Sequence, residues 1–296
     1  MGISDSRELR GTAMAWLDER TDPRVDFGWL STFTYDGSRI PLMDRQRGIR
    51  KPAGMDAALA IRTTFTPPNQ LPPYNDEIGA DGLQRYKYRG TDPDHPENVA
   101  LRRAMEQRLP LIWFVGVASG LYEPIYPVYV IGEEQAELQF ALAVDEGQRF
   151  ITPGTPMDDT TRRYVERITR ARLHQRVFRM QVLLAYTDRC AVCRLKHPTL
   201  LDAAHIIGDA EEGEPVVPNG MSMCKIHHAA FDQNFLGVSP DLTVAINRDL
   251  MEEVDGPMLK HGLQEMHGIR LHVPTSRAQR PDPERLAARY ETFLAG

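Results

Sequence analysis

The spacing of apolar residues predicts a helical start followed by a long β-rich stretch. Residues 5–20 place apolar side chains at helical intervals and predict a short helix. Between residues 27 and 145, short apolar or alternating runs are separated by turn residues, and Tyr35-Asp36-Gly37 is typical of a hairpin turn. Residues 95–109 are a helical exception. This half of the chain is therefore expected to form a curved sheet or barrel with one or two helices.

A turn-rich segment separates this half from the rest of the chain. Residues 151–160 (ITPGTPMDDT) end in a helix-capping pattern, and an arginine-rich helix is expected to continue from there to about Tyr186. One face of that helix is apolar, at Leu173, Val177, Met180 and Leu184. We expect a domain junction at about residues 155–160 and a final helix at 283–296.

Length and composition indicate a folded globular protein. The chain has 296 residues, of which 42% are hydrophobic and 26% charged, and this length suits one large domain or two ordinary ones. The longest apolar stretch, Leu109 to Tyr122, is interrupted by glycines and is too short to span a bilayer. The N-terminal residues are charged where a signal peptide is apolar. We expect a cytoplasmic protein that does not enter membranes.

Positive charge is concentrated in one segment of an acidic chain. The net charge is −6, yet residues 161–180 contain seven arginines against the single acid Glu166. Such a patch attracts phosphate even when the total charge is negative. The alternative is that these arginines form salt bridges with acidic neighbours such as the loop 211–214. Two stripes are candidates for contact with a DNA backbone, one with Arg163, Arg167 and Arg170 and the other with Arg172, Arg176 and Arg179.

Three cysteines and one histidine have the spacing of a zinc site. Cys190 and Cys193 form a C-x-x-C pair, and about 30 residues later Cys224 and His227 form a C-x-x-H pair. An odd, clustered set of cysteines in a chain without an export signal favours metal ligation over disulfides. Four such ligands are the set that zinc binds tetrahedrally. We predict a structural zinc site, and the alternative is that the cysteines are small buried residues.

Three further polar residues lie between and after these ligands. They occur in the order His205, Asn219, His228, with His205 on an expected strand at 200–207 and His228 in an expected helix at 227–234. With this order the segment resembles the zinc-stabilised HNH, or ββα-metal, nucleases. The resemblance implies that His205 is the general base, that Asn219 orients it or assists the metal, and that His228 binds a catalytic divalent ion.

This residue set suits phosphodiester hydrolysis. Imidazole titrates near neutral pH and can activate water, and one divalent cation, magnesium or manganese, neutralises charge on the phosphate. Many HNH nucleases carry an acidic residue or a second histidine before the base, where this chain has Ala204. Asp232, four residues after His228 and on the same helical face, is the preferred additional metal ligand, and its alternative role is a cap or a surface ion pair. Asp202, at an odd offset from His205, is expected on the opposite face of the strand.

The first 155 residues are expected to choose the target, since an HNH unit has little sequence preference of its own. They contain, in order, Tyr88-Arg89-Gly90, Asn98-Val99-Ala100-Leu101 and an apolar strand at 111–117. These pieces resemble a divergent SRA (SET and RING associated) or PUA-like DNA-binding domain, although Arg89 replaces a small residue of that pattern. The resemblance implies that a modified cytosine is flipped into a pocket and read there. The candidates to stack on that base or accept a hydrogen bond from it are Phe65, Tyr74, Asp76 and Tyr88.

Together these patterns predict an α+β protein with an SRA/PUA-like β-barrel-type domain followed by a zinc-stabilised ββα-metal domain. The expected divisions are 1–157 for recognition, 158–187 for the linking helix, 188–250 for the nuclease and 251–296 for a C-terminal extension. Proteins with these two domains in this order are modification-dependent restriction endonucleases acting on double-stranded DNA.

Two other functions fit the same residues. One is an HNH nuclease directed at unmodified DNA, RNA or a signalling ligand, and the other is a non-catalytic, zinc-containing DNA-binding regulator. A single HNH site cuts one strand, so double-strand cleavage requires a homodimer or two independent events, and the sequence does not decide between them.

Overall fold

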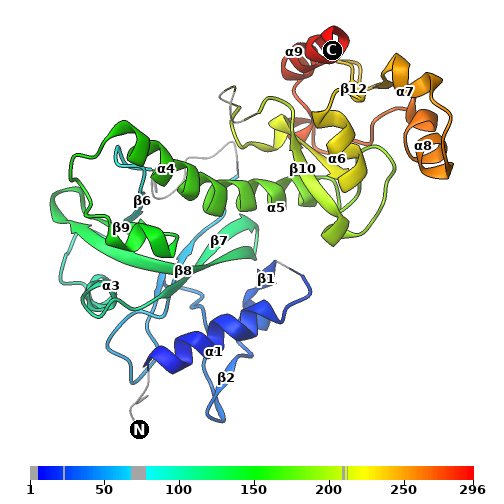
Figure 1. Cartoon of the computed structure of the whole chain (residues 1–296). Helices are drawn as coiled ribbons and strands as arrows, with labels where there is room; N and C mark the ends of the chain where they lie inside the picture. Colours follow the sequence, from blue (N-terminus) through cyan, green and yellow to red (C-terminus); the bar gives the residue numbers. More distant parts are fainter. Residues whose placement is uncertain (1–5, 23, 68–77, 209–210, 212) are drawn as a thin grey trace. The chain divides into compact units, whose positions relative to one another are not determined.

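The chain forms two compact units, Met1–Val177 and Phe178–Gly296 (Figure 1). The computed structural model describes residues 6–22, 24–67, 78–208, 211 and 213–296. The division between the units falls inside the arginine-rich helix, later than the expected junction at 155–160. Across the described ranges, no helix combines the length and apolarity needed to cross a membrane.

A seven-stranded sheet forms the centre of the N-terminal unit. Its main path runs β4-β5-β7-β8-β9-β6, and β1 pairs with β8 beside this path. β5 and β7 run parallel, whereas the other described pairs are antiparallel. Register shifts between β7 and β8 and between β8 and β9 introduce bulges, which curve the sheet into a half-barrel. The strands are β1 (Val25–Asp26), β4 (Ile49–Arg50), β5 (Ala60–Thr63), β6 (Gln84–Lys87), β7 (Leu111–Ala118), β8 (Leu121–Glu134) and β9 (Gln139–Ala143).

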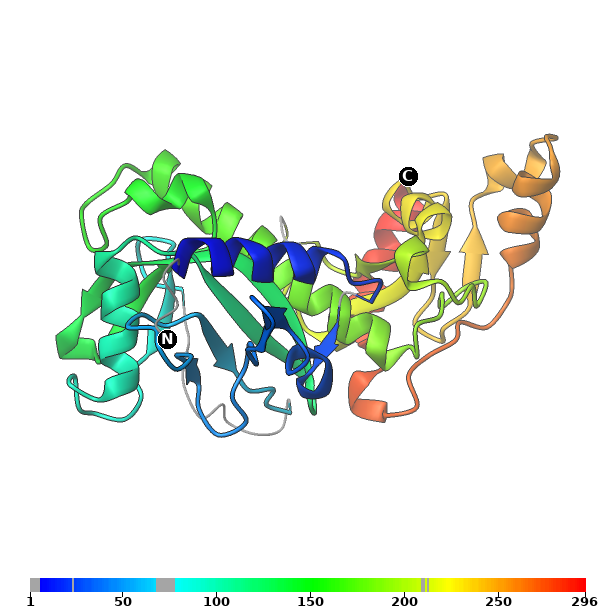
Figure 2. The same ribbon diagram turned by 90° about the horizontal axis from the view of Figure 1, so that it is seen from below.

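Both faces of this sheet are covered, which explains the uninterrupted apolar run of β7. Trp113 belongs to a core shared with α3 (Pro96–Glu106), while Ile112 and Phe114 belong to a second core shared with α1 (Ser6–Asp18). Successive side chains of a strand point to opposite faces, so a strand buried on both sides is apolar at every position. Figures 1 and 2 show α1 lying against the sheet. The two helices predicted in this half are confirmed.

The hairpin predicted at Tyr35-Asp36-Gly37 is also present. β2 (Thr34–Tyr35) pairs with β3 (Ser38–Arg39), and the short helix α2 (Phe27–Leu30) precedes them. Asp36 and Gly37 have φ angles of 48° and 68°, the left-handed conformation that a two-residue hairpin turn requires.

Asn98 links two pieces of the predicted recognition motif. Its side chain is buried and accepts a hydrogen bond from Arg89 N at 2.8 Å, while its Nδ2 donates to Arg89 O and Asp92 O. The asparagine at the start of α3 therefore holds the turn at Gly90, where φ is 65°. These contacts explain why the Tyr88-Arg89-Gly90 turn and the Asn98 helix occur together in the sequence.

The arginine-rich helix has three parts. α4 (Asp159–Thr169) begins at the N-cap Asp158, whose carboxylate accepts hydrogen bonds from Thr160 N and Thr161 N at 3.0 Å. A π-helical turn at Arg170–His174 connects α4 to α5 (Gln175–Ala185). The extra residue in a π turn shifts the faces of the helix. The buried positions of α5 are Phe178, Met180, Val182 and Leu183. Of the predicted stripe, Leu173 and Met180 are buried, whereas Val177 and Leu184 are partly buried.

The C-terminal unit is built on a ββα arrangement, as predicted. β10 (Leu201–His205) and β11 (Gly220–Cys224) form an antiparallel hairpin, and α6 (Lys225–Asp232) follows β11 without a linker. A second hairpin of β12 (Leu236–Val238) and β13 (Val244–Ile246) comes next. The remaining helices are α7 (Arg248–Glu252), α8 (Pro257–Gly262) and α9 (Pro283–Ala295), and Figure 1 shows α9 next to β12.

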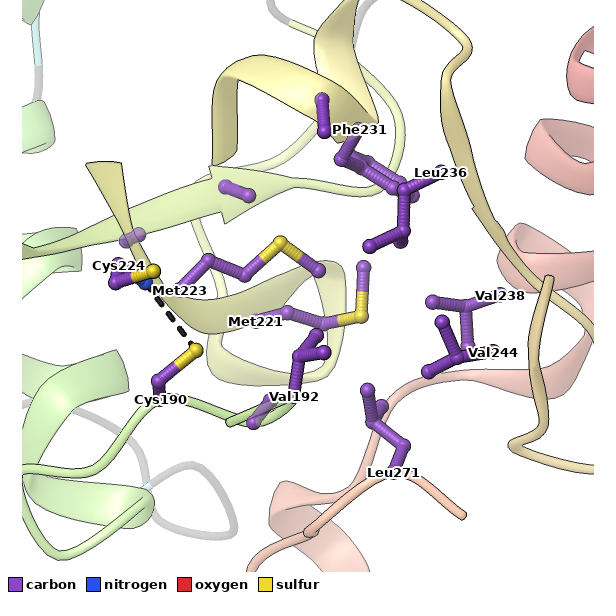
Figure 3. Packing of buried hydrophobic residues seen from close by; sticks show 14 of the residues in the cluster. Cys190, Val192, Met221, Met223, Cys224, Phe231, Leu236, Val238, Val244 and Leu271 are labelled. Carbon is purple, nitrogen blue, oxygen red and sulfur yellow. Dashed lines mark hydrogen bonds between the residues drawn. The ribbon is translucent and has the colours of Figure 1, made fainter. Parts of the chain in front are cut away.

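Residues beyond 250 belong to the core of this unit. Met221 and Met223 of β11 pack with Phe231 of α6, and Leu271 closes the same cluster (Figure 3). Leu286 of α9 is fully buried in it. Gly237 of β12 lies so close to α9 that an added Cβ would be 2.4 Å from Phe293 Cδ1. The part predicted as a C-terminal extension is therefore packed into the core of the nuclease unit.

We expect Leu286→Ala to lower the free energy of unfolding of the C-terminal unit by about 2–5 kcal/mol, because it leaves a cavity in a packed core. Leu294→Ala on the same helix is the matched control, since Leu294 is 67% exposed, and it should change stability by less than about 0.5 kcal/mol. Denaturant unfolding measures both. Equal effects of the two variants would show that α9 is not part of the core.

Candidate metal centre and cleavage site

The four predicted zinc ligands meet in one cluster. Cys190 and Cys193 lie in the turn after α5, Cys224 ends β11, and His227 lies in the first turn of α6. Their donor atoms all lie within 4.8 Å of one another, with His227 Nδ1 at 3.1 Å from Cys224 Sγ and 3.5 Å from Cys190 Sγ. A tetrahedral zinc with bonds of about 2.3 Å separates its ligands by roughly 3.8 Å. The donor set and its spacing therefore fit zinc.

Backbone and side-chain contacts orient these ligands. Cys224 N donates to Cys190 Sγ at 3.3 Å (Figure 3). Hydrogen bonds from the thiols of Cys190 and Cys193 hold the pKa of Cys224 well below its usual range, which favours the thiolate that binds metal. His227 Nε2 lies 2.8 Å from Gly262 O, at the end of α8. Donation to this carbonyl leaves Nδ1, which faces the sulfurs, as the ligand atom.

His205 is the last residue of β10 and is placed by the hairpin register, which pairs it with Gly220. Its ring stacks on Phe178, with centroids 4.2 Å apart. An added Cβ at Gly220 would lie 2.6 Å from Val182 Cγ2 and 2.7 Å from Phe178 Cζ. Glycine at this position therefore allows Phe178 to approach the hairpin and support the His205 ring.

Asn219 is fully buried and is engaged by the backbone. Its Oδ1 accepts from Ile207 N at 2.9 Å, and its Nδ2 donates to Ile207 O at 3.0 Å and to Glu214 O at 2.9 Å. Its own carbonyl accepts from Ile206 N. These bonds fix the segment directly after His205.

His228 and Asp232 lie one turn apart on α6. His228 Nε2 is 3.3 Å from Asp232 Oδ2. Two ligands of one octahedral ion, at bond lengths of about 2.1 Å, are separated by roughly 3 Å, so this pair has the spacing of a shared cation site. Ala204, at the position where many HNH nucleases have an acid, is fully buried.

Asp202, which its offset predicts on the opposite face of the strand from His205, is held by cations. Its carboxylate is 2.7 Å from Lys225 Nζ and 3.3 Å from Arg179 Nε. Burial of Asp202 opposes ionisation, but the hydrogen bond and charge of Lys225, the hydrogen bond from Ala203 N and the charge of Arg179 together outweigh it and lower the pKa of the carboxyl. Its Oδ2 lies 4.0 Å from His228 Nδ1, too far for a direct hydrogen bond.

Two of the three candidate catalytic residues, His205 and His228, open onto one cavity of about 590 Å³, whereas the buried Asn219 is not among the residues that line it. His205, His228 and Asp232 line it together, and Glu211 and Asn234 lie beside them. α9 contributes a further wall with Ala288, Arg289 and Thr292, which the sequence interpretation did not include. The residues of the HNH motif all lie before residue 240, so the motif gives no indication of α9. Only the folded structure shows that Arg289 lines the cavity.

The two arginine stripes differ in their surroundings. In the second, Arg172 pairs with Asp145 at 2.8 Å, Arg176 pairs with Glu123 at 2.5 Å, and Arg179 donates to Pro198 O and Leu201 O. In the first, Arg170 pairs with Glu166 at 2.7 Å and remains exposed. Arg163 and Arg167 are exposed and have no ion-pair partner among the described residues.

The acidic partners are not those named in the alternative interpretation. Glu214, from the loop proposed to neutralise the arginine helix, pairs instead with Arg285 at 2.8 Å. The first stripe is therefore the part of the helix best suited to a phosphate backbone.

The structure describes two of the four predicted base-pocket residues, Phe65 and Tyr88. Tyr88 is 2% exposed, its ring lies 4.9 Å from that of Phe140, and its hydroxyl bonds to Glu133. Burial and the Glu133 carboxylate raise the pKa of Tyr88 to about 12. Its interpretation as a stacking residue needs correction, because both the ring and the hydroxyl are used inside the core. Phe65 is partly buried beside Gly116, while Tyr74 and Asp76 lie outside the described residues.

Comparison with known proteins agrees with the ββα geometry. Residues 190–239 match the family model described as HNH endonuclease. Residues 190–239 are thus an HNH endonuclease domain, and the protein is a nuclease. A search of curated proteins finds no match.

Two solved structures are similar at low identity. "Modification dependent TagI restriction endonuclease" shares 19% identity, with a TM-score of 0.29, and the alignment covers 83% of this chain and 85% of that one. "Structure of the Type IV phosphorothioation-dependent restriction endonuclease ScoMcrA" shares 16% identity, with a TM-score of 0.23, covering 63% of this chain and 48% of that one.

We expect Cys224→Ser to lose bound zinc and to unfold the C-terminal unit at a much lower temperature, because structural zinc contributes about 10–16 kcal/mol in small zinc domains. His261→Ala is the control, since His261 is exposed on α8 and pairs only with Glu265 among the described residues. Elemental analysis of zinc per chain and thermal unfolding measure the effect. A Cys224→Ser protein with wild-type zinc content and melting temperature would contradict the assignment.

Proposed function

We propose that the protein is a restriction endonuclease that hydrolyses phosphodiester bonds of modified double-stranded DNA. The observation that carries this proposal is the convergence of His205, His228 and Asp232 on one cavity inside the segment that matches the HNH family. The cleavage site then lies in the C-terminal unit, and the N-terminal unit selects the DNA.

In this proposal His205 is the general base. Its imidazole takes a proton from the water that attacks phosphorus, a step for which imidazole is the side chain most often used. Stacking on Phe178 keeps the ring in one orientation, and Asn219 fixes the backbone that follows it. A magnesium or manganese ion held by His228 and Asp232 would supply positive charge to the phosphate.

The zinc cluster is proposed to be structural. Its ligands Cys190, Cys193, Cys224 and His227 complete a tetrahedral set, so no open position is left for substrate. The cluster connects the turn after α5 with β11 and α6, and thereby holds the helix that carries His228 and Asp232.

The N-terminal unit is proposed to read a modified cytosine. The sequence resemblance to SRA/PUA-like domains and the link between Asn98 and the turn at Gly90 support this interpretation. The exposed arginines of the first stripe, Arg163, Arg167 and Arg170, are proposed to contact the phosphate backbone. Tyr88 is not included in the proposed pocket, because its ring is buried and its hydroxyl bonds to Glu133.

Cleavage of matched duplexes containing cytosine, 5-methylcytosine, 5-hydroxymethylcytosine or a phosphorothioate linkage, with magnesium or manganese, tests the proposal. We expect cutting of a cytosine-modified duplex only, and a loss of about 10²- to 10⁴-fold in His205→Ala, because general-base catalysis contributes that much. His197→Ala is the control, since His197 is an exposed histidine away from the cavity.

The other outcomes separate the two parts of the proposal. Cutting of every duplex would keep the nuclease and reject the modification reader. Cutting of the phosphorothioate duplex alone would mean that the N-terminal unit reads a phosphorothioate linkage and not a modified cytosine. Binding of DNA without cutting under any condition would favour the zinc-containing regulator.

A further inference from the structure

The cavity at the cleavage site has two walls from distant parts of the sequence. His205, His228 and Asp232 come from the segment that matches the HNH family, whereas Arg289 and Thr292 come from α9, about 50 residues further along. Arg289 is the one lysine or arginine among the described residues that line the cavity. Its position outside the family segment means that the HNH pattern assigns it no role.

The Arg289 guanidinium is held in place from one side. Its Nη1 donates to Asn234 Oδ1 at 2.6 Å, and its Nη2 donates to Phe231 O. The guanidinium carbon lies 4.5 Å from the centroid of the Phe231 ring. A guanidinium has five N–H donors, so these two contacts leave three for another ligand. A charged group fixed in this way needs little reorganisation to bind an anion.

The helix that carries Arg289 is itself fixed. Asp282 caps its N-terminus by accepting from Glu284 N and Arg285 N, and Leu286 is fully buried in the core. Phe293 packs against Gly237 of β12. Arg289 therefore projects into the cavity from a rigid element.

The cavity wall carries negative charge that a cation such as Arg289 can balance. Asp232 and Glu211 place two carboxylates on the wall, and a phosphodiester brings a further negative charge. Negative charge on the phosphate oxygens increases as water attacks phosphorus. Arginine matches the spacing of two phosphate oxygens through paired N–H donors.

We propose that Arg289 is a catalytic residue that binds the non-bridging oxygens of the scissile phosphate and stabilises their charge during hydrolysis. This inference rests on the proposed function, because it takes the cavity of His205, His228 and Asp232 as the cleavage site. It adds α9 to the nuclease active site and explains why the chain continues beyond the HNH segment as part of the same core.

Single-turnover cleavage by full-length Arg289→Ala, Arg289→Lys and Arg285→Ala tests this proposal. Arg285 lies one turn earlier on α9 and pairs with Glu214 at 2.8 Å, so its variant is a matched control. We expect Arg289→Ala to cleave about 10²- to 10³-fold more slowly, the usual effect of removing one donor that stabilises a transition state. Arg285→Ala should cleave at nearly the wild-type rate, with Arg289→Lys intermediate.

Added guanidinium ion separates catalysis from a purely structural role. At millimolar concentrations it should restore part of the activity of Arg289→Ala and none of that of His205→Ala, and the melting temperature of Arg289→Ala should stay close to that of Arg285→Ala. A rate equal to that of Arg285→Ala, or a loss of rate that follows a lowered melting temperature and is not restored by guanidinium, would overturn the proposal.

A phosphate-binding measurement tests the Arg289 proposal separately from the proposed function. Inorganic phosphate is added, and its binding is monitored by NMR through the chemical shifts of the Ala288 and Thr292 amides. Shifts in wild type and Arg285→Ala that are absent in Arg289→Ala are expected. If wild type binds phosphate in this way but cuts none of the duplexes, the endonuclease proposal fails for those substrates and the phosphate site remains. If the wild-type protein shows no such shifts and Arg289→Ala cleaves as fast as wild type, the Arg289 proposal fails while the endonuclease proposal stands.

Discussion

The C-terminal unit depends on the cluster of three cysteines and one histidine. Its ligands come from the turn after α5, from the end of β11 and from the start of α6, and their donor atoms lie within 4.8 Å of one another. A ββα unit of two five-residue strands and an eight-residue helix has little apolar surface of its own to bury. The hydrogen bond between His227 Nε2 and Gly262 O extends the same constraint to α8. The position of the proposed cleavage site follows from this cluster.

The length of the hairpin separates the cysteine–histidine cluster from the proposed catalytic site. Its register pairs Leu201 with Cys224 at the zinc end and His205 with Gly220 at the other end. Four residue steps of about 3.3 Å place the ends roughly 13 Å apart. On α6, His227 faces the cysteines and His228, rotated by about 100° around the helix, lies beside Asp232. Two adjacent histidines can therefore serve two centres without competing for one ion.

The sequence predicted what local spacing and alternation determine. The Cys190 and Cys224 pairs, the Asp36-Gly37 turn and the helix after Asp158 each rest on residues within a few positions of each other. The ββα order was implied by the resemblance to HNH nucleases. Contacts between distant segments could not be derived in this way. Tyr88 has an aromatic ring of the kind that stacks on bases. However, its hydroxyl bonds to Glu133 and its ring contacts Phe140, both about 50 residues later in the chain. The sequence did not predict that α9 lines the cavity, for the same reason. Arg289 of α9 contacts residues near 230, which are distant in the sequence.

In the arginine-rich helix, fewer arginines are available to a phosphate backbone than the sequence contains. Seven arginines lie between residues 161 and 180, but Arg176 is held by Glu123, whose side chain is 2% exposed, and Arg179 is used by the β10 hairpin. An arginine that left a buried carboxylate for a phosphate would break a buried ion pair, at a cost of several kcal/mol. Exposed arginines without such a partner, Arg163 and Arg167, bear no such cost. Attraction of a DNA backbone should thus concentrate on α4, at the N-terminal side of the π turn, even though the charge pattern of the sequence extends along the whole helix.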